Sequence, residues 1–418
     1  MKRIILTILI STSLLQSFAQ VATSNTGFYA DRLNRIDRVF QAAVDSNWIV
    51  GAVCLVMKDG RPAYYKAFGM DDAERRKPMQ KDAIFRIASQ TKAITSTAVM
   101  LLWEEGKFLL DDPISKYIPS FAAPKVIQTF NDTDSSYTAV PAKREVTIRD
   151  LLTHTSGLGY AQIGSAKMRA IYAKAGIEAG FLDHKGLLAN SIDKLGKLPL
   201  EFNPGERFNY SLSIDVLGRL VEVASGMPLD QFLSKRIFEP LEMKDTYFDL
   251  PQSKQARLAN VYTEDRSSRK PVKWKRNTFP GSTIDYPINH NGYFAGGAGL
   301  VSTASDYANF LQLFLNKGTF NGKQLLARHT VELMTENQIG NLSLGDDKFG
   351  LGFQIITEKG SAKLGLSPGS ISWSGFFGTF YWADPREHLS GLLFMQQSPL
   401  THNELDHKFK VLVYQALK

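Results

Sequence analysis

The chain has 418 residues, of which 44% are hydrophobic and 22% are charged, and its formal net charge is +8 at pH 7. A chain of this length and composition can bury a large core, in one large domain or in two closely packed ones. Cys54 is its single cysteine, which excludes an intramolecular disulfide. Because Cys54 stands in an apolar run, we expect it to be a small core residue, and the stability of the chain must come from packing.

The first residues have the pattern of an export signal. Two basic residues precede a short apolar stretch over residues 4–15, and residues 17–19 supply the small side chains that a signal peptidase needs. The stretch is too short for a permanent helix across a bilayer of about 30 Å. We therefore predict that residues 1–19 are a signal peptide cleaved after Ala19, and that residues 20–418 act as one unit in the periplasm or outside the cell. No later segment has the roughly 18 consecutive apolar residues of a membrane span, so no stable span is expected.

The densest positive charge lies at residues 266–276. A nucleic-acid site is one interpretation of such a patch, and an exposed loop is the other. No helical period and no aromatic repeat accompanies the charge. We therefore predict an exposed loop and no nucleic-acid partner.

The N-terminal part of the chain carries clear local signals. Apolar residues recur at helical spacing over residues 33–43. Residues 51–57 and 63–68 have the pattern of two strands, joined by an Asp-Gly hairpin turn. From Ser89 the apolar period is helical again and defines one apolar face.

The middle of the chain differs from its C-terminal part. Residues 108–290 show few strand signals, and their helix-like segments are 148–153, 213–224 and 229–237. Strand patterns return at 351–357, 371–382 and 391–397, and a last helix covers residues 405–416.

This order of elements predicts an α/β (α+β) fold with two lobes. Residues 27–107 and 291–418 form the two halves of a sheet domain, an antiparallel sheet flanked by the N- and C-terminal helices. Residues 108–290 form an inserted, mainly helical lobe. A cleft between the lobes is where a functional site is expected.

Three segments match the pattern Ser-x-x-Lys, and their context separates them. The pattern begins at Ser89, Ser191 and Ser267. Ser267 lies in the basic loop, where nothing excludes water or lowers a lysine pKa. Ser191 has no sustained helix pattern behind it. Only Ser89 stands at the start of a long amphipathic helix, after an apolar lead-in.

The position of Ser89 has chemical consequences. Residues three apart on a helix lie on one face, with Cβ atoms about 5–6 Å apart, so Lys92 can reach the Ser89 hydroxyl. A helix N-terminus favours a developing oxyanion and disfavours a charged lysine, and burial acts on the lysine in the same direction. The spacing predicts a serine nucleophile activated by Lys92. The alternative is that Ser89 only caps the helix and Lys92 is a solvated surface residue.

Other candidates for a catalytic centre are weaker. Ser367 lies in a Gly-x-Ser-x-Gly pattern, but Pro368 has no backbone N–H for an oxyanion and no helix pattern follows, so Ser367 is interpreted as a turn residue. His154 stands at the predicted end of a helix and is interpreted as structural. No spacing typical of a metal site occurs, and neither a metal nor an organic cofactor is expected.

Two further segments complete a pattern that resembles the serine β-lactamase and penicillin-binding protein superfamily. The first contains Tyr210, in Asn203-Pro204-Gly205-Glu206-Arg207-Phe208-Asn209-Tyr210-Ser211-Leu212-Ser213, and the second is Ile371-Ser372-Trp373-Ser374-Gly375-Phe376. Residues 147–158 and 296–303 add to the similarity. The chain is most similar to class C β-lactamases and to the related family VIII carboxylesterases. The resemblance covers essentially the whole mature chain and implies the β-lactamase/transpeptidase-like fold.

The resemblance assigns roles to these residues. Tyr210 is the second-motif tyrosine and shares a proton with Lys92, so the base is the coupled pair of Lys92 and Tyr210. The backbone N–H groups of Ser89 and Phe376 form the oxyanion hole. Gly375 permits a substrate to lie along the strand. Without the other motifs, Tyr210 would be read as an aromatic core residue.

Two departures from the family pattern bear on the substrate. Trp373 replaces the lysine that usually begins the third motif of β-lactamases, and Leu212 replaces an asparagine of the second motif. Both changes remove polar groups that hold an anionic amide substrate. They leave an apolar wall that includes Phe376 and Phe377, next to Ser374 and Gly375. Family VIII esterases share the tryptophan, so a neutral ester is the expected substrate, with weak β-lactam hydrolysis as an addition.

The resemblance therefore implies an exported serine hydrolase that cleaves carboxylic esters through an acyl-enzyme on Ser89. The alternatives are a β-lactamase, a D-Ala-D-Ala peptidase or transpeptidase, and a non-catalytic binding or sensor module of the same fold. The expected partner is a small ester or β-lactam-like molecule.

Overall fold

The structure is a computed structural model and describes residues 27–177, 180, 186–275, 278, 283–289 and 292–418. The predicted signal peptide lies outside the described residues, as does Arg276 at the end of the basic patch. Within the described part of the chain, no helix has the length and apolar character needed to cross a membrane.

One antiparallel sheet joins the two ends of the chain, as predicted. Its strands lie in the order β12-β13-β14-β15-β16-β1-β2-β3. Their bounds are β1 Gly51–Lys58, β2 Arg61–Asp72, β3 Lys77–Pro78, β12 Lys348–Phe349, β13 Gln354–Ile355, β14 Ile371–Gly375, β15 Thr379–Asp384 and β16 Leu389–Phe394. The N-terminal strand β1 pairs with the C-terminal strand β16, with Val56 opposite Gly391. This pairing closes the sheet across more than 300 residues of sequence.

The predicted strand over residues 371–382 is wrong in one respect, because it is two strands. Strand β14 ends at Gly375 and β15 starts at Thr379. The N–H of Gly378 donates to the carbonyl of Gly375 at 3.0 Å, and Gly378 has φ +77°. A tight turn with a glycine in the left-handed region reverses the chain where the apolar pattern continues.

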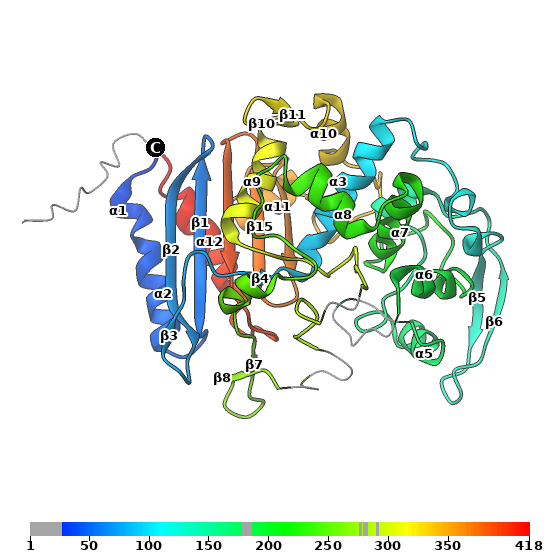
Figure 1. The fold of residues 1–418 in the computed structure, drawn as a ribbon, viewed down its shortest axis with the longest axis horizontal. Coiled ribbons are helices and arrows are strands. Elements are labelled where there is room, and N and C mark those ends of the chain that lie inside the picture. Colours follow the sequence, from blue (N-terminus) through cyan, green and yellow to red (C-terminus); the bar gives the residue numbers. More distant parts are fainter. Residues whose placement is uncertain (1–26, 178–179, 181–185, 276–277, 279–282, 290–291) are drawn as a thin grey trace, which may run out of the picture.

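Helices cover both faces of the sheet (Figure 1). Helix α2 (Arg35–Asp45) and helix α12 (Glu404–Tyr414) pack on one face, together with the short α1 (Ala30–Leu33) and α11 (Glu358–Leu364). Helix α9 (Ala304–Leu315) packs against β1, β15 and β16 on the other face. Side chains of β1 alternate between the two cores: Cys54 belongs to the core under α2 and α12, and Val53 to the core under α9. Cys54 is fully buried, as predicted.

The second lobe is less purely helical than predicted. Its helices are α4 Ile148–Leu152, α5 Ala166–Lys174, α6 Leu188–Gly196, α7 Ser213–Ser225 and α8 Leu229–Leu233. Two strand pairs accompany them, β5 Lys125–Phe130 with β6 Tyr137–Pro141, and β7 Tyr262–Glu264 with β8 Pro271–Lys273. The side chains of β5 and β6 are mostly exposed, so these strands have no apolar run that periodicity could detect.

Helix α3 (Thr91–Glu104) joins the two lobes. It packs against α7 and α8, and its residues Thr91 to Leu102 are all buried. The sequence predicted that one apolar face of this helix is buried, whereas its polar side is buried as well. Thr95 and Thr97 satisfy their hydroxyls on the carbonyls of Gly296 and Ala93.

The smaller elements connect this framework. They are β4 Phe85–Arg86 paired with β9 Val301–Ser302, β10 Thr319–Phe320 paired with β11 Lys323–Gln324, and α10 Arg328–Thr335. Strand β4 lies directly before the Ser89 turn in the sequence, and β9 comes from the other half of the sheet domain.

Candidate active site

Ser89 lies in a single 3₁₀ turn, Ala88–Gln90, immediately before α3. The expected α-helix thus begins two residues later than Ser89, at Thr91. Ala88 has φ +44°, a conformation that a residue with a Cβ adopts only when its surroundings impose it. The N–H of Ile87 donates to the carbonyl of Leu300 at 3.1 Å and holds the entry to the turn. Ser89 is half-buried between buried neighbours, so its hydroxyl is presented on a strained and fixed turn.

Lys92 reaches Ser89 as its spacing predicts. Its Nζ donates to Ser89 Oγ at 3.3 Å and to the carbonyl oxygen of Gly297 at 2.6 Å. The ammonium also lies 4.6 Å from the ring centroid of Tyr210 and 5.5 Å from that of Tyr160. The Gly297 carbonyl and the two ring faces thus surround the Lys92 amine. The alternative of a solvated surface lysine is wrong, because Lys92 is 3% exposed.

Tyr210 stands beside Lys92 in the segment that leads into α7. Its ring packs on His154, Trp373 and Tyr160, with centroid distances of 4.9, 5.4 and 5.6 Å. Its hydroxyl is buried, and no hydrogen-bond partner for it exists among the described residues. Buried hydroxyls are nearly always hydrogen-bonded, so an unpartnered one beside Ser89 and Lys92 marks a place for a group from outside the protein.

His154 fixes the backbone on both sides of Tyr210. The N–H of Asn209 donates to the His154 carbonyl at 2.8 Å, and the N–H of Ser211 donates to His154 Nδ1 at 3.3 Å. Burial, with a smaller contribution from the Lys92 cation, holds the pKa of His154 well below its usual range. The imidazole is therefore neutral and its Nδ1 is an acceptor. The sequence indicated a structural role for His154 but contained no sign of this link to Tyr210.

Strand β14 forms the other side of the site. Trp373 is half-buried and packs against Tyr210 and against Phe349, whose ring centroid is 5.5 Å away. A Cβ on Gly375 would lie 2.3 Å from the carbonyl oxygen of Ile87. The glycine therefore lets the strand approach the Ser89 turn, a role that the sequence did not reveal. Phe376 is the next residue, and Ser374 is exposed.

Two residues predicted to line the substrate wall are core residues instead. Leu212 is 1% exposed and caps α7 from within the main core. Phe377 is 0% exposed and packs against Trp274 and Ala88, behind the Ser89 turn. Apolar character identifies both as buried but does not tell a cleft from a core. Neither offers surface to a ligand in this structure.

Two residues near Lys92, Gly297 and Asp215, had no role assigned from the sequence. Gly297 accepts the Lys92 hydrogen bond, and its own N–H donates to Asp215 Oδ1 at 3.2 Å. The paired glycines at 296 and 297 are the sequence signal that a backbone approaches another element closely here.

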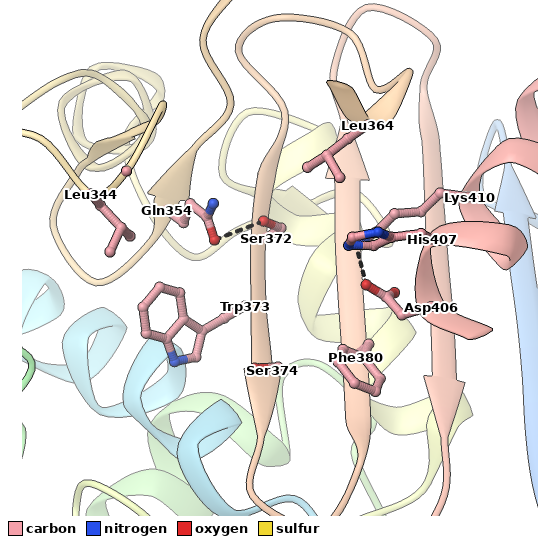
Figure 2. A pocket seen from close by; sticks show the side chains of 11 residues that line it. Leu344, Gln354, Leu364, Ser372, Trp373, Ser374, Phe380, Asp406, His407 and Lys410 are labelled. Atoms are coloured by element: carbon pink, nitrogen blue, oxygen red, sulfur yellow. Dashed lines mark hydrogen bonds and ion pairs between the residues drawn. The ribbon is translucent and has the colours of Figure 1, made fainter. Parts of the chain in front are cut away.

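A separate pocket of about 460 Å³ lies on the α12 side of β14 (Figure 2). Asp406 and Lys410 of α12 line it and pair with each other at 2.6 Å. The indole of Trp373 is directed away from them in Figure 2. Ser89, Lys92 and Tyr210 do not line it, whereas Trp373 and Ser374 do, so the pocket adjoins the site around Ser89 along strand β14.

The competing serines lack comparable surroundings. Ser191 is buried within α6 while Lys194 is exposed, so the two do not form a pair. The absence of a helix expected there is wrong, since both residues lie on α6. Ser267 is exposed in the loop between β7 and β8 and donates to Asp265, as a loop residue is expected to do. Ser367 lies between α11 and β14 with its N–H on Asp384. Across the described ranges, no cluster of metal-binding side chains occurs.

Comparison with known proteins agrees with this geometry. The chain matches the Beta-lactamase family over residues 36–415. Protein Rv1367c of Mycobacterium tuberculosis (strain ATCC 25618 / H37Rv) is 33% identical over 369 residues, covering 85% of this chain and 88% of that protein. Esterase EstB of Burkholderia gladioli is 30% identical over 376 residues, covering 86% of this chain and 89% of EstB.

A solved structure shows the same fold. EstCE1, described as a hydrolase with promiscuous acyltransferase activity, superposes with a TM-score of 0.78 at 27% identity, covering 92% of this chain and 99% of EstCE1. The predicted fold class is thereby confirmed. The chain belongs to the β-lactamase family and is a serine hydrolase of the β-lactamase/transpeptidase fold, related to the family VIII esterases.

Proposed function

We propose that this serine hydrolase is exported and cleaves carboxylic esters through an acyl-enzyme on Ser89. One observation carries the proposal: Lys92 Nζ lies 3.3 Å from Ser89 Oγ and 4.6 Å from the Tyr210 ring, while the Tyr210 hydroxyl has no partner among the described residues. A nucleophile, a lysine–tyrosine base and a buried hydroxyl without a partner in the described protein thus meet at one point. Export is proposed from residues 1–19 alone.

The reaction has two acyl-transfer steps. Ser89 Oγ attacks the ester carbonyl while the Lys92–Tyr210 pair accepts the hydroxyl proton. The N–H groups of Ser89 and Phe376 stabilise the oxyanion. Tyr210 returns the proton to the leaving alcohol, whose oxygen lies within hydrogen-bonding distance of the Tyr210 hydroxyl. A water molecule, deprotonated by the same pair, then releases the acid and restores Ser89.

The preference for an ester rests on Trp373. This residue stands where β-lactamases usually carry a lysine, and its indole packs on Tyr210 and Phe349. An indole offers an apolar surface and no charge for a carboxylate. Leu212 contributes nothing to this preference, because its side chain is buried. The name of EstB as an esterase and the description of EstCE1 as a hydrolase support the ester.

A labelling experiment tests the nucleophile. The protein lacking residues 1–19 is treated with a fluorophosphonate probe, and the modified residue is located by mass spectrometry. We expect label on Ser89, loss of label in Ser89→Ala and retention in the matched variant Ser367→Ala. Label on Ser367, or no label at all in a folded protein, would contradict the assignment and favour the binding-module alternative.

A substrate panel tests the reaction class. Short-chain p-nitrophenyl esters, nitrocefin and a D-Ala-D-Ala peptide are compared by kcat/KM. We expect the esters to be turned over best and Ser89→Ala to remove that activity. Faster hydrolysis of nitrocefin would indicate a β-lactamase, and activity on the peptide without activity on esters would indicate a peptidase. Export is tested separately, by the N-terminal sequence of protein recovered from the periplasm.

A further inference from the structure

A buried carboxylate stands behind the hydrogen bond that Lys92 makes to the loop at Gly297. Asp215 lies in the first turn of α7 and is 2% exposed. Its Oδ1 accepts the Gly297 N–H at 3.2 Å, and its Oδ2 has no partner among the described residues. The carbonyl of Gly297 accepts Lys92 Nζ at 2.6 Å. Gly297 thus connects the buried carboxylate of Asp215 to Lys92, the lysine of the proposed lysine–tyrosine base.

The connection is rigid because the loop has no free space. A Cβ on Gly297 would lie 2.4 Å from Asp215 Oδ2, and a Cβ on Gly296 would lie 2.8 Å from the Ile214 carbonyl oxygen. The Thr95 hydroxyl donates to the Gly296 carbonyl at 2.8 Å from the α3 side. The two glycines are therefore held between α3 and α7. The Gly297 carbonyl has one position relative to Lys92.

The positive charge of the buried Lys92 requires a negative charge nearby. Tyr160 faces the ammonium with its ring and His154 is neutral, so neither supplies a negative charge. Asp215 is the acid that interacts with the cation: burial raises its pKa and the Lys92 charge opposes that rise. A buried charge is costly unless an opposite charge compensates it. When ionised, the Asp215 carboxylate compensates the Lys92 charge through the Gly297 peptides.

We propose that Asp215 is a positioning residue that holds Lys92 through Gly297 and, by its negative charge, keeps Lys92 as the ammonium so that the Tyr210 oxygen takes the proton of Ser89. The inference rests on the proposed function. In proton terms, the Lys92–Tyr210 pair shares one proton. A negative charge beyond Gly297 moves that proton to Lys92 and leaves a phenolate. Ser89 then gives its proton to the phenolate, and the phenol returns it to the leaving alcohol.

Asp215→Asn tests the charge without removing the hydrogen bond. Asparagine has nearly the same shape and its carbonyl oxygen still accepts the Gly297 N–H. The pair becomes active when it loses a proton from its cationic form. Removing a nearby negative charge destabilises that cation, so the acid limb of the kcat/KM profile moves to lower pH. We expect a shift of about one pH unit, the lower end of the effect of a neighbouring opposite charge. The limiting kcat falls and KM changes little.

Asp306→Asn is the matched control, since Asp306 is also a buried acid whose pKa burial raises. It serves the N-terminus of α9 through Thr303 and Thr246, so its loss should lower stability and leave the pH profile in place. Should Asp215→Asn not fold, Gly297→Ala is expected to displace the Asp215 carboxylate and give the same shift. A folded Asp215→Asn or Gly297→Ala with the wild-type acid limb would overturn the inference. Retained ester hydrolysis in Ser89→Ala would overturn the proposed function instead.

Discussion

Tyr210→Phe separates the chemical role of Tyr210 from its packing. The substitution removes one oxygen and keeps the ring, whose contacts with His154 at 4.9 Å, Trp373 at 5.4 Å and Tyr160 at 5.6 Å hold it in place. The hydroxyl that is lost makes no hydrogen bond within the described residues. Stability and activity are therefore expected to change in opposite directions.

The magnitudes follow from these contacts. A buried hydroxyl without a partner costs about 1–3 kcal/mol, of which a water molecule recovers a part in the free enzyme. We expect Tyr210→Phe to raise the free energy of unfolding by about 1 kcal/mol or to leave it unchanged. Loss of the group that moves the proton lowers kcat by about 10²- to 10⁴-fold, with KM little affected. Active sites commonly trade stability for function in this way.

The assay combines denaturant unfolding with steady-state hydrolysis of a p-nitrophenyl ester. Tyr160→Phe is the comparison variant, because Tyr160 stacks on Tyr210 and is not the proposed base. Tyr210→Phe with kcat within threefold of wild type would refute the role of the hydroxyl. A loss of stability larger than about 1 kcal/mol would refute the claim that the hydroxyl is unpartnered, since a made hydrogen bond is worth about that much.

Three further predictions concern residues around this centre. The neutral His154 has a depressed pKa, so the unfolded chain binds more protons than the folded one below about pH 6.5, and the free energy of unfolding falls as pH decreases below that value. His154→Gln should flatten this pH dependence in denaturant titrations between pH 5 and 7. The same variant should lower kcat by about tenfold, because Tyr210 is held less firmly. Gly375→Ala places a methyl 2.3 Å from the Ile87 carbonyl oxygen and should cost about 1–3 kcal/mol in thermal unfolding, with a lower rate of labelling at Ser89; an unchanged melting temperature would show that the strand does not need this close approach. Trp373→Lys should raise the ratio of nitrocefin to ester turnover by about tenfold, the effect of one charge-assisted hydrogen bond of about 1.5 kcal/mol; a lower ratio would exclude Trp373 as the residue that disfavours an anionic substrate.

Local patterns predicted the framework of the molecule well. The hairpin of β1 and β2, the helix after Ser89 and the terminal helices follow from periodicity and turn residues, because these depend on neighbours within a few positions. Periodicity misplaced the boundary between β14 and β15, where the apolar run continues through a turn. It also missed β5 and β6, whose side chains are mostly exposed. Apolar periodicity in a sequence cannot reveal a strand whose side chains are mostly exposed.

Burial itself was decided by the tertiary structure. Leu212 and Phe377 carry the apolar character of a substrate wall, yet both are closed off in the core. Helix α3 has a polar side in its sequence, yet that side is buried between the lobes. There Thr95 and Thr97 donate to backbone carbonyls, while Ser96 Oγ has no partner among the described residues. The sequence indicates whether such a side chain is apolar or polar. It does not indicate which part of the protein packs over that side chain.

Ser89 and Lys92 could be proposed as a pair from the sequence, because side chains three residues apart on a helical turn can reach each other and because this Ser-x-x-Lys segment alone precedes a long amphipathic helix. The spacing by itself is not sufficient, since Ser191 and Lys194 have it on α6 without pairing. The motifs around Tyr210 and Trp373 added the family, and with it the expectation of a lysine–tyrosine pair. Only the tertiary structure brought Gly297 to Lys92 across 205 residues and to Asp215 across 82. Contacts between segments so far apart depend on how the lobes pack around α3, and no local pattern encodes that packing.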